Sequence, residues 1–169
     1  MKIFLTVVIL FLSTLLFSQE IQTTHSFAII GKVKSPVTIS FDDLTELKVV
    51  NIGDLIVTNH LGEERGTAKS LKGVLLRDVF QKIEIDVESP KFLSEYFFIC
   101  RASDNYTVVF SWNEIFNTVV GEGVFIVTEK DGRPMTDMEE NILMVSVRDI
   151  RTGRRHVKSL SSIEVARAK

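Results

Sequence analysis

The stretch FFICRASDNYTVVFSWNEIF, residues 97–116, indicates the fold more clearly than any other part of the chain. It opens with a dense apolar run of strand length, and Ser103–Asn105 then has the composition of a turn. Tyr106–Phe110 is expected to be the return strand. Ser111 is expected to cap a short helix, with Glu114 three residues later as its capping-box partner. The stretch therefore predicts a β-hairpin followed directly by a helix.

The only cysteine of the chain, Cys100, lies in the first of these strands. Strand alternation puts Phe98, Cys100 and Ala102 on one face, while Arg101 points to the other. A reactive thiol needs an accessible, electropositive setting, and free cysteine is otherwise among the most buried residue types. We therefore expect Cys100 to be a core residue and not a nucleophile or a metal ligand.

Short strands outnumber helices in the rest of the chain. Strands are expected at 26–33, 48–60 (with a turn at Gly53-Asp54), 123–128, 142–147 and 156–165, helices after Ser40 and at 71–83, and a polar loop at 61–70. This order predicts an α+β fold with a β-rich, mixed or barrel-like sheet and a few short helices.

The N-terminus has the features of a secretory signal peptide. Lys2 precedes an apolar run over residues 3–17, which is shorter than the roughly 20 residues needed to span a bilayer. We assign residues 1–19 to the signal, 20–25 to a polar spacer and 26–169 to one domain. Neither a lipoprotein cysteine nor a twin-arginine pair is present, so we expect a periplasmic or secreted protein without a membrane span once the signal is removed. An uncleaved anchor is the alternative.

The composition excludes several function classes. The formal net charge is -2, so no general electrostatic attraction to nucleic acid is expected. The sequence has no G-x-S-x-G nucleophile motif and no glycine-rich phosphate-binding motif. No residue is assigned a catalytic role on these grounds.

Two features could belong to a binding site. His60 ends an apolar run at the entry to a loop and is the one histidine considered as a metal ligand. The alternative is that it is simply a polar residue at the end of a strand, with no ligand. Residues 148–169 carry an excess of basic side chains, of which Arg154, Arg155 and Lys158 are the closest together. A solvated strand edge or an anion site would explain them.

The order of motifs resembles the molybdopterin-binding domain of the sulfite oxidase family, in a small single-domain form. Four segments are similar to it, and together they cover most of residues 28–165: IIGKVKSPVTISFDDL (29–44), GTAKSLKGVLLRDVF (66–80), ASDNYTVVFSWNEI (102–115) and EKDGRPMTDMEENILMVSVRDIRTGRRHVKSLSSIEV (129–165). Asn105 stands where the family's D-G-Y turn has glycine, and asparagine tolerates the left-handed conformation that such a turn requires.

The resemblance implies a fold that holds molybdenum through a pterin dithiolene, with a protein cysteine as a further ligand. The corresponding positions here are Thr58, Asn59 and His60, none of which supplies a thiolate. Lys158 matches a lysine of the family. Glu140 begins the stretch that replaces the family's G-P-L-R and would repel a phosphate.

The combined expectation is an exported binding module for a pterin, another small anionic ligand or a protein partner. Its candidate site residues are Thr58, Asn59, His60, Arg65, Thr67, Ser70, Asp104, Tyr106, Arg154, Arg155 and Lys158. Molybdopterin is the cofactor that the resemblance implies. A genuine molybdopterin-dependent oxidoreductase subunit and a structural scaffold are the alternatives.

Overall fold

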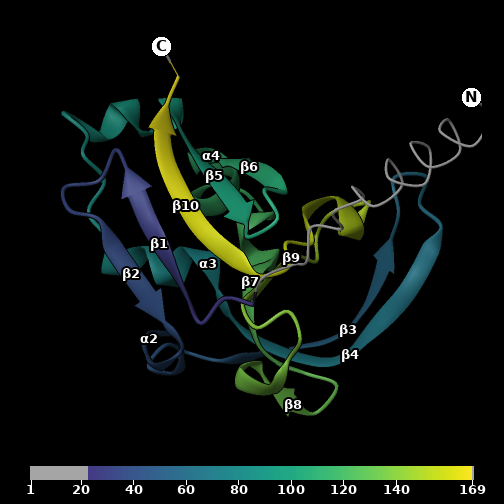
Figure 1. Cartoon of the computed structure of the whole chain (residues 1–169). Coiled ribbons are helices and arrows are strands. Elements are labelled where there is room, and N and C mark those ends of the chain that lie inside the picture. Colours follow the sequence, from purple (N-terminus) through teal and green to yellow (C-terminus); the bar gives the residue numbers. More distant parts are fainter. Residues whose placement is uncertain (1–22, 169) are drawn as a thin grey trace, which may run out of the picture.

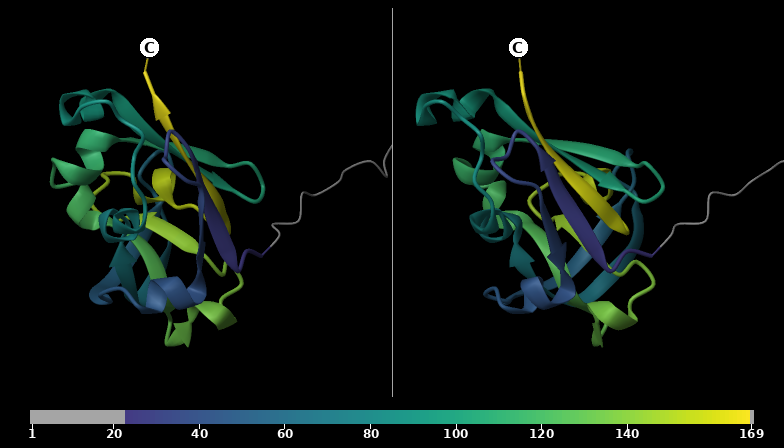
Figure 2. Two further views of the ribbon diagram at one scale, coloured as in Figure 1. Left: turned by 90° about the vertical axis from the view of Figure 1, so that its left-hand side faces the viewer. Right: turned by 60° about the vertical axis from the view of Figure 1, so that its left-hand side comes forward.

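The computed structural model describes residues 23–168, which form two five-stranded sheets around a shared core (Figure 1). The first sheet has the order β2 (Val37–Ser40), β1 (Ser26–Gly31), β10 (Leu160–Arg167), β5 (Tyr96–Ala102) and β6 (Thr107–Ser111). Its pairs are antiparallel except for β1 and β10, which run parallel with Ala28 opposite Ser162. Figure 2 shows these two strands side by side.

The second sheet is antiparallel and carries the longest strands. Its order is β3 (Val50–Thr58), β4 (Glu64–Leu75), β7 (Val124–Lys130) and β8 (Arg133–Pro134), and β9 (Leu143–Ser146) also pairs with β7. The β3–β4 hairpin curves away from the body of the sheet as a long arm (Figure 1). This hairpin arm, residues 50–70, also forms one wall of a pocket.

Helices are short and lie between the strands. The α-helices are α2 (Phe41–Thr45), α3 (Leu76–Val79) and α4 (Trp112–Phe116), and the 3-10 helices are η1 (Phe80–Lys82), η2 (Pro90–Glu95), η3 (Gly121–Gly123), η4 (Met135–Asp137) and η5 (Thr152–Arg155). The predicted α+β class with a few short helices is confirmed. In residues 23–168 no helix has both the length and the apolar character that crossing a membrane requires.

The hairpin and helix predicted for residues 97–116 are confirmed as β5, β6 and α4. In β5, Phe98 and Cys100 are fully buried and Ala102 nearly so, while Arg101 on the other face is half-buried. Burial raises the pKa of the Cys100 thiol to about 12, so the thiolate is absent at neutral pH. Asn105 has a φ of 68°, as expected for the turn. Cys100 is therefore a core residue.

Both capping boxes are formed as predicted. The Ser111 hydroxyl accepts a hydrogen bond from the Glu114 N–H at 3.1 Å, and the Glu114 carboxylate accepts one from the Ser111 N–H at 2.8 Å. Ser40 and Asp43 make the equivalent pair at the start of α2.

Some predicted boundaries were wrong. The loop expected at 61–70 is largely the first half of β4, and the helix expected at 71–83 begins only at Leu76. No turn interrupts the strand at Gly53, where β3 instead continues through a shift in register. The last strand starts at Leu160, because residues 156–159 form a connecting segment with a single bridge from Val157 to Met144.

Candidate functional site

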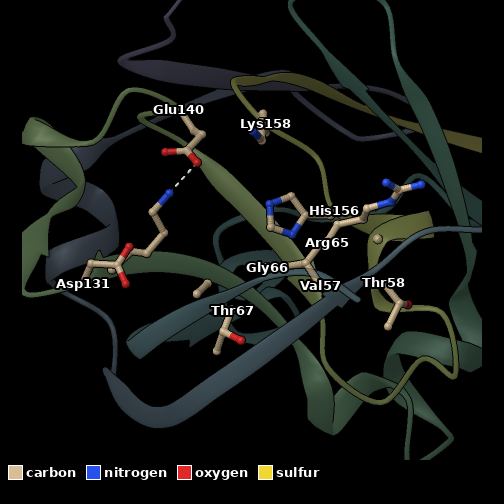
Figure 3. A pocket seen from close by; sticks show the side chains of 12 residues that line it. Val57, Thr58, Arg65, Gly66, Thr67, Asp131, Glu140, His156 and Lys158 are labelled. Atoms are coloured by element: carbon tan, nitrogen blue, oxygen red, sulfur yellow. Dashed lines mark hydrogen bonds and ion pairs between the residues drawn. The ribbon is translucent and has the colours of Figure 1, made fainter. Parts of the chain in front are cut away.

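A pocket of about 510 Å³ lies where the hairpin arm faces the C-terminal segment (Figure 3). The arm supplies Val57, Thr58 and residues 65–68, and the end of β7 supplies Lys130 and Asp131. The remaining lining residues are Glu140, Gly153, His156 and Lys158. Four segments that are far apart in the sequence thus form one wall each.

The segment around η5 is attached directly to the end of β3. The Thr152 hydroxyl donates to the Ile56 carbonyl at 2.6 Å and accepts from the Thr58 N–H at 3.1 Å. A Cβ on Gly153 would lie 2.1 Å from the Thr58 carbonyl oxygen, so only glycine allows this close approach. These contacts fix the distance between the arm and the C-terminal segment, and with it the width of the pocket.

The turn between β5 and β6 closes the same region from the other side. The Tyr106 hydroxyl donates to the Arg154 carbonyl at 2.6 Å, and the Asp104 carboxylate accepts from the Tyr106 N–H at 2.9 Å. A smaller pocket of about 250 Å³ is lined by Asp104, Tyr106 and Ala102 and shares Gly153, His156 and Lys158 with the larger one. The two pockets therefore adjoin at His156 and Lys158.

Two polar atoms in the larger pocket are buried without a hydrogen-bond partner among the described residues. They are the Thr58 hydroxyl oxygen and Nδ1 of His156. Burial, with a smaller contribution from the nearby Lys158 ammonium, lowers the pKa of His156 to about 4. The imidazole is therefore neutral at physiological pH. Buried polar atoms are normally hydrogen-bonded, so this pair is suited to a ligand that supplies the missing partners.

Some charged side chains around the pocket have ion-pair partners within residues 23–168 and others do not. Lys130 is ion-paired with Glu140, and the Asp131 carboxylate accepts from the Lys69 N–H at 2.9 Å. Lys158 forms no ion pair with any described residue. Arg65 reaches only Glu63, at 3.5 Å and in an exposed position, which is a weak interaction. Lys158 and Arg65 are thus the cations left to attract an anion.

The pocket brings together part of the predicted candidate site. Thr58, Arg65, Thr67 and Lys158 line the larger pocket, and Asp104 and Tyr106 line the smaller one. Five predicted residues lie outside both linings: Asn59, His60, Ser70, Arg154 and Arg155.

Three of these five belong to the hairpin arm. The Asn59 side chain accepts from the N–H groups of Leu61 and Glu63 and so holds the tip of the hairpin. His60 is exposed at that tip. Ser70 has a φ of 51°, and its N–H donates to Asp54, so it forms part of a local irregularity in the strand.

Arg155 has structural partners that neutralise it. Its guanidinium donates to Asp149 at 2.7 Å and to Glu114 at 2.9 Å, and it lies 4.1 Å from the ring centroid of Phe110. Arg154 is exposed and contributes its carbonyl to the bond with Tyr106. Arg155 therefore connects η5 to the start of α4.

Among the pocket residues that were not candidates from the sequence, His156, Lys130 and Glu140 matter most for the chemistry of the site. His156 could have been found, because in an extended segment it shares a face with Lys158 two positions later. Lys130 and Glu140 meet at the pocket only because the chain between them folds back along β7 and through η4. No pattern in the sequence joins these two.

No protein-family model matches the sequence, and no curated protein matches it. Among solved structures, the chain is similar to the crystal structure of the sulfane dehydrogenase SoxCD from Paracoccus pantotrophus, with a TM-score of 0.60 and 14% sequence identity. The fold is sulfite oxidase-like. The match covers 83% of this chain but 38% of the SoxCD chain, so this chain spans well under half of its neighbour's length.

The donor set does not fit a molybdenum atom ligated by the protein. The pocket lining contains no cysteine, and Cys100 is buried in β5 with a strongly raised pKa. Within residues 23–168, no group of three histidine, cysteine or acidic side chains could hold a metal ion. Soft thiolate is the ligand that such a site calls for. The basic and hydroxyl side chains of the pocket fit an anionic organic ligand better.

Proposed function

We propose that this chain is a sulfite oxidase-like binding module that holds a small anionic ligand, with pterins among the candidates. The observation that carries the proposal is the pocket itself. It joins an unpaired ammonium, Lys158, to two buried polar atoms on Thr58 and His156 that lack partners. An anion at Lys158 and a hydrogen-bonding group beside His156 would satisfy all three.

Direct binding measurements test this proposal. Thermal unfolding with added phosphate, sulfate or a reduced pterin should show stabilisation, which reaches about 2.7 kcal/mol when a ligand is present at 100 times its dissociation constant. Lys158→Gln should remove most of the effect. Lys48→Gln, which changes an exposed lysine outside the pocket, is the matched control and should retain it.

The alternative functions predict different results. A scaffold, or a module that binds only a protein partner, predicts that none of these small molecules stabilises the chain. Such an outcome would overturn the proposal.

The second candidate function is that of a molybdopterin-dependent oxidoreductase subunit. The similarity of this chain's fold to the sulfane dehydrogenase SoxCD favours this candidate. The absence of a thiolate from the pocket counts against it. Metal analysis of the protein purified from its native host distinguishes the two. We expect no stoichiometric molybdenum and no pterin dithiolene, and finding both would replace the binding module by the enzyme.

We further propose that the module acts in the periplasm or outside the cell. The support is the signal-like sequence of residues 1–19, which lie outside the described residues. Mass spectrometry of the native protein would show a new N-terminus near residue 20 if the signal is cleaved. An intact Met1 in a cytoplasmic fraction would contradict this location.

A further inference from the structure

The ion pair between Lys130 and Glu140 lies where two hollows of the candidate site meet. Both residues line the main pocket, and both also line a third hollow of about 300 Å³ that includes Arg133 and Glu139. Their side chains are only 21% and 12% exposed, so the pair is largely enclosed by protein. A ligand that extends from the main pocket into this third hollow would pass beside it.

Ser159 holds the backbone of Glu140 by two hydrogen bonds. Its carbonyl oxygen accepts from both the N–H and the hydroxyl of Ser159, each at 3.1 Å. The next residue, Asn141, is buried with a φ of 46°. These contacts fix the backbone of Glu140, and the carboxylate itself is held by its ion pair with Lys130.

The Glu140 carboxyl remains ionised at neutral pH. Burial alone would raise its pKa, but the Lys130 ammonium that donates to it holds the pKa below its usual range. Lys130 is neutralised in return, so it cannot serve as an additional anion-binding group.

The local charge therefore limits what the pocket can hold. Arg65, Lys130 and Lys158 face Asp131 and Glu140, and only Arg65 and Lys158 remain effectively free. The Lys158 ammonium also helps to lower the pKa of Glu140, and it offsets the charge of one compact anion bound beside it. A ligand with several negative charges would bring one of them near this carboxylate, where repulsion is strong because the site is partly shielded from water.

We infer that Glu140 is a specificity-determining residue that excludes multiply charged anions such as polyphosphates from the pocket. The ligand class is then an anion with one compact charged group, attached to a neutral portion that hydrogen-bonds to His156 and Thr58. This inference rests on the proposed function.

A set of charge variants tests it with inorganic phosphate and pyrophosphate as probes. Calorimetric titration at fixed ionic strength gives the affinity of each probe for the wild type, Glu140→Gln, Lys130→Gln and the double variant. In Glu140→Gln, Lys130 loses its counter-charge, and we expect the preference for pyrophosphate over phosphate to rise about tenfold. Lys130→Gln leaves Glu140 without its counter-charge and should lower both affinities, that of pyrophosphate more. The double variant, which lacks the carboxylate, should keep a preference for pyrophosphate above that of the wild type.

Two comparisons keep the result interpretable. Glu122→Gln changes the net charge equally at an exposed residue outside the pocket, and it should leave the preference unchanged. Circular dichroism confirms that each variant is folded. If the wild type binds phosphate but Glu140→Gln has the same preference as the wild type, the inference is wrong while the proposed function stands. If neither probe binds wild type or variant, the inference is overturned, and the proposed function is overturned as well only if sulfate and the reduced pterin also fail to stabilise the chain.

Discussion

At the level of single residues, His156 combines burial, a missing hydrogen-bond partner and neighbouring positive charge. Its ring is a neutral polar group in a pocket that also carries Lys158 and Lys130. A protonated ring there would be both poorly solvated and repelled. The neutral form is therefore part of the folded structure, and stability must depend on pH through this one side chain.

The lowered pKa of His156 gives the direction in which stability changes with pH. The unfolded chain protonates His156 near pH 6.5, whereas the folded chain resists protonation until about pH 4. Between these values the unfolded state binds more protons, so the free energy of unfolding should fall as the pH is lowered. We expect a loss of about 2 kcal/mol between pH 7.5 and pH 5, measured by urea denaturation.

His156→Gln should abolish most of this loss, because its side chain does not titrate. His25→Gln removes an exposed histidine outside the pocket and should leave the pH dependence intact. The range above pH 5 avoids the carboxyl groups whose pKa values are lowered, Asp43, Glu114 and Glu140, since their contributions to stability are lost mainly below their usual pKa values. An identical slope in wild type and His156→Gln would contradict the assignment.

At the level of elements, the capping box of α4 has a double role. Glu114 closes the box with Ser111 and also accepts from Arg155, which in turn binds Asp149. The helix start is thus linked to η5, the 3-10 helix that borders the pocket.

Ser111→Ala should therefore lower the free energy of unfolding by about 1–2 kcal/mol, because it removes the hydroxyl that accepts from the Glu114 N–H. Urea denaturation at pH 7.5 measures this. Ser35→Ala, at an exposed position in a connecting segment, is the control and should change the stability by less than about 0.5 kcal/mol. Equal effects of the two substitutions would show that the box contributes nothing.

The capping boxes could be predicted because their information is local, within four residues. Residues 61–70 were misassigned for the opposite reason. The segment is polar because the hairpin arm is exposed to solvent, and it is a strand only because β3 supplies its backbone partners. Likewise, residues 72–75 extend β4 because they pair with β7, 50 or more residues away in sequence.

At the level of the whole molecule, the two sheets share one hydrophobic core. Buried residues from both sheets belong to a single cluster, which includes Phe27 and Phe98 from the first sheet and Val74 and Ile126 from the second. The two sheets therefore cannot separate without exposing the core that they share.

We therefore expect equilibrium unfolding in one cooperative transition. The single tryptophan, Trp112, packs on the core near α4 and reports on that region, while far-UV circular dichroism reports on both sheets. The urea midpoints of the two signals should coincide within error. Separate midpoints would show that the hairpin arm or one sheet unfolds independently.

The candidate site could be predicted only in part, because some of its contacts depend on the tertiary structure of the whole molecule. Thr58, Tyr106 and Lys158 could be proposed from the resemblance, because each lies in or beside a motif. The partnership of Lys130 with Glu140 depends on how the chain folds back through η4, and the use of Arg155 as an internal ion-pair partner depends on the position of η5 beside α4.

The position of β10 has a consequence for how the protein is made. This strand lies between β1 and β5 at the middle of its sheet, yet it is synthesised after every other strand of the two sheets. Until Leu160–Arg167 emerge from the ribosome, β1 can pair only with β2, and β5 only with β6. The nascent chain therefore carries two separate hairpins with open edges, and the two sheets form one unit only after β10 has been synthesised.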